Sequence, residues 1–193
     1  MKFTAAELDF LLSEDSGWPP LREAWGLRPS AEPAEARSHG AASLIAREIA
    51  DVVGGELEVS SEALVLARRL TQPAHVFQLV GVAGGSASLS TYLLGADGSR
   101  TMTNVVAPGV MEIDALKADE SAGEQLAAII TAALESNDGS FVLRAVTAEP
   151  ALVVSTSRSG TQWRVGDSTW STAAEFEAEL ALEFGRHFPR ADA

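Results

Sequence analysis

The chain has 193 residues, of which 46% are hydrophobic, a formal net charge of −13 at pH 7 and no cysteine. This is enough apolar material for a sizeable core, and the lack of cysteine excludes disulfides, cysteine-ligated zinc or iron–sulfur sites and thiol nucleophiles. The negative field disfavours binding to nucleic acid or to anionic membranes.

The N-terminal segment, residues 1–59, is predicted to be helical. Thr4 and Glu7 form a capping box that begins a short helix. No apolar run precedes this helix, and none in the chain approaches the roughly 20 residues of a membrane span. We therefore expect no signal peptide, no membrane segment and a cytoplasmic location. The polar, proline-containing residues 28–40 are the best candidate for a mobile loop.

Two further helices are predicted before the strands begin. Residues 41–53 carry apolar side chains at helical spacing and are followed by two glycines; these side chains are Leu44, Ile45, Ile49, Val52 and Val53. Ser60 is placed to cap the next helix, which Pro73 cannot continue.

The centre of the chain is predicted to be rich in strands. The β-prone or alternating segments are 75–82, 87–94, 101–106 and 110–113. Asp97-Gly98 is a typical hairpin turn between two of them. Connections this short favour antiparallel pairing.

The last third combines helices with strands. Ser121 and Glu124 form a second capping box before a helix with a clear apolar stripe. Strands are predicted over 141–146, 152–155 and 161–165, with a turn over 157–160 between the last two. Thr172 caps a final helix, which Gly185 ends.

This order of elements predicts an α+β fold with a central antiparallel sheet and flanking helices, rather than a doubly wound α/β fold. We expect a single domain over residues 1–193: a helical segment 1–59, a helix–strands–helix half 60–136, a strands–helix half 140–185 and a tail 186–193. The two halves are compatible with a degenerate internal duplication, although no sequence period supports one.

The sequence offers no convincing catalytic, cofactor or metal site. His39, His75 and His187 share no spacing that suits a metal. Residues 84–88, Gly-Gly-Ser-Ala-Ser, lack the final glycine of a nucleophile elbow and join two predicted strands. The glycines at 81–85 are not followed by the Gly-Lys-Ser/Thr of a phosphate-binding loop. The interpretation is that the protein is not an enzyme.

The chain resembles the EspG family. Residues 3–12 and 18–21 are similar to its opening, a Thr-capped helix with Glu and Leu followed by a Pro-Leu segment. The helix of residues 64–70, the break at Pro73 and the following strands repeat the family's layout over most of the chain. The second half is shorter than in typical members.

The resemblance implies a cytosolic chaperone of type VII (ESX) secretion. EspG proteins bind helical PE/PPE-type substrates and keep them soluble, and their α+β fold has quasi-two-fold related halves. A sheet-side loop and the C-terminal helical part contact the substrate. By position, the implied partner-binding residues are Val82, Gly84, Gly85, Ser86, Phe176, Leu180 and Phe184.

Three functions are therefore open from the sequence. The first is a chaperone for a PE/PPE- or WXG-like helical protein, which requires an exposed apolar patch on the sheet or its hairpin tips. The second is an unrelated adaptor, immunity-type or self-associating module, such as a homodimer, whose sheet face is covered or self-paired. The third is a small hydrolase with a concave polar pocket.

Overall fold

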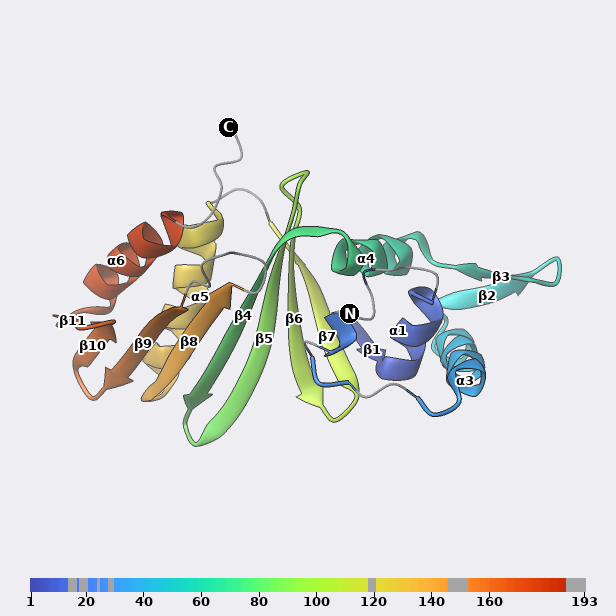
Figure 1. The fold of residues 1–193 in the computed structure, drawn as a ribbon, viewed down its shortest axis with the longest axis horizontal. Coiled ribbons are helices and arrows are strands. Elements are labelled where there is room, and N and C mark those ends of the chain that lie inside the picture. The colour runs from blue at the N-terminus through green and yellow to red at the C-terminus, as the bar shows by residue number, and fades with distance from the viewer. Residues whose placement is uncertain are drawn as a thin grey trace. The chain divides into compact units, whose positions relative to one another are not determined.

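The computed structural model confirms the α+β class: nine strands form a large antiparallel sheet, two more form a small hairpin, and helices flank them (Figure 1). It describes residues 1–13, 17, 21–23, 25–27, 30–117, 121–145 and 153–186. The chain divides into two compact units. Unit 1 comprises Met1–Ala74 with Thr101–Ala115, and unit 2 comprises His75–Arg100 with Leu116–Ala193. These boundaries cut across the halves expected from the sequence.

Unit 1 is mainly helical. Its elements are β1 (Lys2–Thr4), α1 (Ala5–Leu11), α3 (Pro33–Ala46), β2 (Ala50–Val53), β3 (Glu56–Val59), α4 (Ser61–Thr71) and most of β6 (Arg100–Ala107) and β7 (Val110–Leu116). The capping box of α1 is confirmed, because the Glu7 amide donates to Thr4 Oγ1 at 3.2 Å and the Thr4 amide donates to Glu7 Oε2 at 2.7 Å. Ser60 caps α4 as predicted. The Trp18–Pro20 connector lies outside the described residues.

The mobile loop expected over residues 28–40 is wrong for its second half, which begins α3. Pro33 stands in the first turn of the helix, where its missing amide hydrogen loses no bond. Gly40 explains how α3 packs, because a Cβ at this position would lie 2.0 Å from the Ala6 carbonyl oxygen. Only a glycine lets the two helices approach so closely.

The helix expected over residues 41–53 is also wrong in its second half. α3 ends at Ala46, and Glu48 adopts a positive φ of 58° that breaks the helical path. Residues 50–53 instead form β2, which pairs with β3 so that Val52 faces Leu57. Gly54 and Gly55 have φ of 64° and 91° and make the turn of a hairpin rather than a helix end.

Unit 2 holds most of β4 (Pro73–Ala83) and the remaining elements: β5 (Ser86–Gly95), α5 (Ala122–Ser136), β8 (Gly139–Ala145), β9 (Val153–Ser159), β10 (Gln162–Val165), β11 (Ser168–Trp170) and α6 (Ala173–Gly185). Its strands follow the order β5-β4-β8-β9-β10-β11, while unit 1 contributes β1-β7-β6 to the sheet. The predicted strands of unit 2 are confirmed over the described residues, which exclude positions 146 and 152, and both of its helix caps are confirmed. The predicted turn at 157–160 is displaced, since β9 continues to Ser159, and the short β1 and β11 were not predicted.

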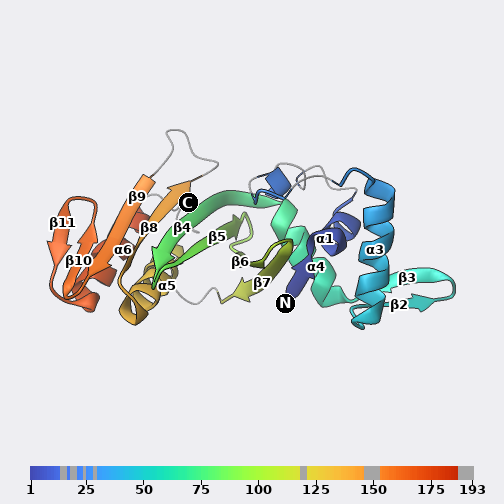
Figure 2. The ribbon, with the colours of Figure 1, turned by 90° about the horizontal axis from the view of Figure 1, so that it is seen from below.

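Helices α5 and α6 lie on the same side of β8, β9 and β10 (Figures 1 and 2). Between helices and strands lies a core of large apolar side chains, including Leu79, Leu126, Ile130, Leu134, Phe141, Leu143, Trp163, Phe176, Leu180 and Phe184. Gly81 makes room for one of them: a Cβ there would lie 2.1 Å from Phe141 Cδ1 on the paired strand. We call this side of the unit 2 sheet the covered face.

Candidate protein-binding surface

The opposite side of the unit 2 sheet, which we call the open face, is defined by strand register. Val80 pairs with Val142, which pairs with Ser155; Val82 begins a second row of paired residues that continues across the sheet. Paired residues in neighbouring strands point to the same face, and alternate residues along a strand share it. The open face therefore carries Gln78, Val80, Val82, Ser140, Val142, Arg144, Ser155, Ser157 and Arg164.

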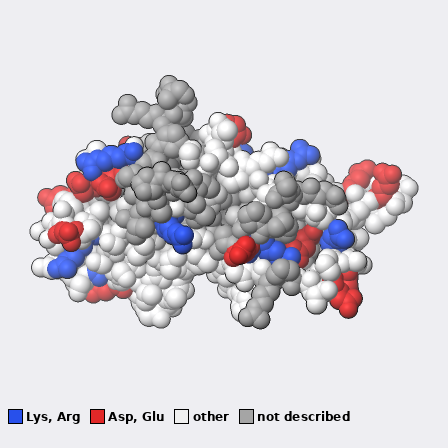
Figure 3. Space-filling model, viewed as in Figure 1, with Lys and Arg blue, Asp and Glu red and all other residues white. Residues whose placement is uncertain are grey.

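Three valines of the open face form an exposed apolar cluster. Val80 is 51% exposed, Val82 49% and Val142 39%, and the surface over β4 and β8 is mainly uncharged (Figure 3). Isolated exposed valines are ordinary, but neighbouring ones on one sheet face form a patch of the kind that proteins use for docking. The alternation within 75–82 placed Val80 and Val82 together, whereas Val142 joins them only through the pairing of β4 with β8.

The hairpin tip predicted from the sequence adjoins this cluster. Val82 lies at the end of β4, and Gly84 and Gly85 turn the chain with φ of 57° and 79° before Ser86 begins β5. The Gly84 amide donates to the Asp138 carbonyl at 3.3 Å, which ties the tip to the start of β8. The structure thus brings four of the seven predicted contact residues to one exposed end of the open face.

The other three predicted contact residues occupy a different environment. Phe176, Leu180 and Phe184 are fully buried on the inner side of α6, and the Phe176 ring lies 5.0 Å from the Trp163 ring, centroid to centroid. Their four-residue spacing marks the helix side that closes the core. Their side chains therefore belong to the core and do not face a partner, contrary to the prediction from the sequence, and only the outer side of α6 is accessible.

Arg158 joins the covered face to the end of α5, a role that the sequence did not reveal. Its guanidinium donates to the carbonyls of Leu134 and Glu135 at 2.6 and 2.8 Å and lies 4.9 Å from the centre of the Trp163 ring. These are the last carbonyls of the helix, which lack intrahelical partners and favour a cation. Arg158 thereby fixes the helix layer that supports the strands of the open face.

The described histidines behave as structural or solvated residues. His39 is exposed and lies 3.8 Å from Glu35 on α3, and His75 stacks on Phe77 at 6.4 Å between ring centroids; His187 lies outside the described residues. Within the part of the chain that the structure describes, no three His, Asp or Glu side chains are grouped so as to hold a metal ion.

Unit 1 contains a buried carboxylate with a full set of donors. Glu7 is completely buried and accepts from Thr4 N and Ser43 Oγ, each at 2.7 Å, and from Arg47 at 2.7 and 2.8 Å. Burial by itself raises the pKa of Glu7, but the bonds from Thr4, Ser43 and Arg47 outweigh it, so the net pKa is lowered. This network joins β1, α1 and α3 and has a structural role.

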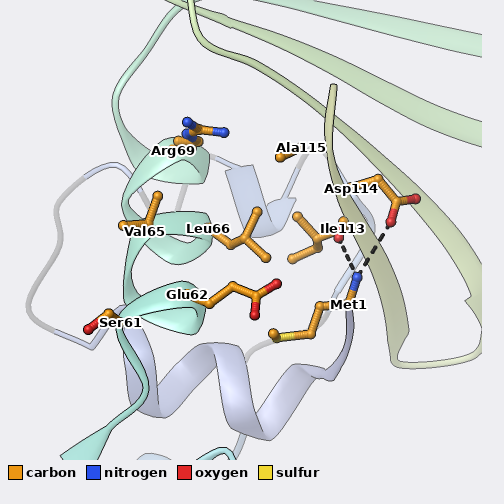
Figure 4. A pocket seen from close by; sticks show the side chains of 9 residues that line it. All are labelled: Met1, Ser61, Glu62, Val65, Leu66, Arg69, Ile113, Asp114 and Ala115. Atoms are coloured by element: carbon orange, nitrogen blue, oxygen red, sulfur yellow. Dashed lines mark hydrogen bonds and ion pairs between the residues drawn. The ribbon is translucent and has the colours of Figure 1, made fainter. Parts of the chain in front are cut away.

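Unit 1 also has an open pocket of about 460 Å³ between α4 and β7. Leu66 and Ile113 face one another within it, and Glu62 and Arg69 extend from α4 at its rim (Figure 4). The Met1 ammonium donates to the Ile113 carbonyl at 2.6 Å. The rim carries charges of both signs, so the pocket favours neither an anionic nor a cationic ligand. None of the contact residues predicted from the sequence lines this pocket.

Comparison with protein-family models and with curated proteins found no match to this chain. Among the helices that the structure describes, none is long and apolar enough to span a membrane.

Proposed function

We propose that this protein is a non-enzymatic, protein-binding chaperone that resembles EspG proteins of type VII secretion. On this proposal it acts in the cytoplasm and keeps a helical, PE/PPE- or WXG-like secretion substrate soluble. The observation that carries the proposal is the cluster of Val80, Val82 and Val142 on the open face of unit 2. A chaperone that shields a helical substrate requires an exposed apolar patch of this kind on its sheet.

The open face suits the apolar side of a helix. Burying a valine side chain completely contributes about 1.5–3 kcal/mol, so three half-exposed valines contribute roughly 3 kcal/mol when a partner covers them. A helix that displays the same amount of apolar surface is prone to aggregate until it is covered. A chaperone keeps such a substrate soluble by covering this apolar surface.

The test is co-expression with the helical secreted proteins encoded nearest the gene, followed by size-exclusion chromatography. The wild type is expected to co-elute with a partner that is insoluble alone. The double variant Val80→Thr/Val142→Thr keeps β-branched side chains and is expected to lose the complex. Val106→Thr, at an exposed strand valine of unit 1, is the matched control and is expected to retain it.

A self-associating or adaptor module is the second candidate, because an exposed apolar face also suits a second copy of the chain. Light scattering on the purified protein separates the two. If the protein alone is a dimer that Val80→Thr/Val142→Thr converts to a monomer, the chaperone proposal is wrong and self-association replaces it.

A further inference from the structure

The open face differs in charge from the rest of the molecule. The chain carries a net charge of −13, yet the described side chains of the open face on β4, β8, β9 and β10 include two arginines, Arg144 and Arg164, and no carboxylate. Both arginines are exposed. Neither forms an ion pair with another described residue.

The two arginines border the valine cluster in two different directions, one along a strand and one across the sheet. Arg144 lies two residues beyond Val142 on β8, about 7 Å along the strand. Arg164 lies in the cross-strand row that runs from Val82 through Ser140 and Ser157, three strands and therefore about 14 Å from Val82. The positions between them hold short serines, which leave room for a bulky element to approach the sheet.

We propose that the occupant of the open face is an acidic amphipathic helix of another protein, with an apolar stripe bordered by Glu or Asp. This inference rests on the proposed function and specifies its partner. A helix about 10 Å wide matches the span of about 10 Å between β4 and β9. Its stripe covers the valines, and carboxylates at its borders reach the guanidinium groups of Arg144 and Arg164, which bind carboxylates in a bidentate geometry.

The charge pattern also argues against other occupants. A basic helix would place its cations against two unpaired arginines. A second copy would bring together two molecules of charge −13 each, which repel one another. An acidic helix is disfavoured at long range by the same net charge, so its attraction arises only where carboxylates and guanidinium groups meet. This makes the arginines determinants of specificity.

The experiment uses two labelled 18-residue amphipathic helical peptides with the same leucine stripe, one bordered by glutamate and one by lysine, and measures fluorescence anisotropy with the full chain. The glutamate peptide is expected to bind at least tenfold more tightly than the lysine peptide at low salt. Arg144→Gln/Arg164→Gln is expected to remove this preference. Arg37→Gln/Arg68→Gln changes exposed arginines of α3 and α4 by the same net charge and is expected to preserve it.

The outcomes separate this inference from the proposed function. In one outcome both peptides bind equally, Val80→Thr/Val142→Thr weakens the binding of both, and Arg144→Gln/Arg164→Gln weakens neither. The open face then binds helices, but its specificity for acidic helices is refuted. If neither peptide binds wild-type protein, both the inference and the chaperone role of the open face are overturned. A dimer that occupies the open face also overturns the inference.

Discussion

The buried Glu7 network offers the sharpest test of how unit 1 is held together. Replacing Glu7 with Gln keeps the shape of the side chain but removes its charge. The Gln carbonyl can still accept from the Thr4 amide, whereas Arg47 and Ser43 lose the carboxylate that accepts their three bonds of 2.7 to 2.8 Å. Each hydrogen bond to a charged group contributes about 1.5–3 kcal/mol.

The expected cost is smaller than the sum of those bonds. The Arg47 side chain is 38% exposed, so water solvates its guanidinium when the carboxylate is lost. The contribution of the Glu7–Arg47 ion pair to stability is therefore smaller than that of a fully buried pair. We expect Glu7→Gln to lower the free energy of unfolding by about 2 kcal/mol, and Glu7→Ala by about 4 kcal/mol, because the alanine variant also leaves a cavity and an unpaired cap amide. Glu112→Gln, at a partly exposed pair with Lys2, is the matched control and is expected to change the free energy of unfolding little.

Acidification provides a second readout of the same network. The folded state holds the pKa of Glu7 below its usual value of 4.5, so the unfolded state takes up its proton first as pH falls. The stabilisation is therefore present above pH 4.5 and is lost as pH falls through the lower folded pKa. Urea unfolding followed by circular dichroism at pH 7 and below pH 4.5 is expected to show a smaller acid loss in Glu7→Gln than in wild type. Equal losses, or equal stability of the two proteins at pH 7, would refute the reasoning.

Three further predictions concern unit 2. Burial raises the pKa of Tyr92, the only tyrosine, to about 12. Ultraviolet titration is expected to show this midpoint in the folded protein and a midpoint near 10 in urea. The stabilisation that comes from keeping Tyr92 neutral is present below pH 10 and is lost as pH rises through 12. Gly81→Ala is expected to cost about 1–3 kcal/mol by forcing the Phe141 ring aside, whereas Gly185→Ala, with no atom within 4 Å of the added Cβ, is expected to be neutral in thermal melts. The Thr156 hydroxyl is buried without a partner among the described residues, so Thr156→Val is expected to leave urea stability unchanged or raise it by up to about 1 kcal/mol; a marked loss would mean that the hydroxyl is satisfied.

Local chemistry explains which elements were predictable. The caps at Thr4, Ser121 and Thr172 depend on residues three apart, and the Asp97-Gly98 turn depends on neighbours, so both could be predicted from the sequence. Residues 49–53 could not, because Ile49, Val52 and Val53 fit helical spacing, and the outcome depends on Glu48 at φ 58°. The three-residue β1 and β11 exist only through their partner strands and are too short to show an alternating pattern.

The candidate surface was only partly predictable for a related reason. Alternation along β4 places Val80 and Val82 on one face of the strand and Leu79 on the other. Both faces carry apolar side chains, so the sequence does not show which face the helices cover. α6 decides the matter by packing its Phe and Leu stripe against the face that carries Trp163. Arg144 and Arg164 share one face only through the register of three strands, β8, β9 and β10, which no single segment encodes.

The division of side chains between the two faces has a consequence for binding strength. Large aromatic and leucine side chains lie on the covered face, while the open face presents valines, serines and two arginines. A partner helix on the open face buries only small β-branched groups, and much of the resulting few kcal/mol offsets the entropy cost of association. We expect such a complex to dissociate readily, which suits the proposed chaperone role, because a chaperone must release its substrate. Discrimination among helices then depends on whether carboxylates meet the two guanidinium groups, because mispaired charges cost more than a lost methyl contact.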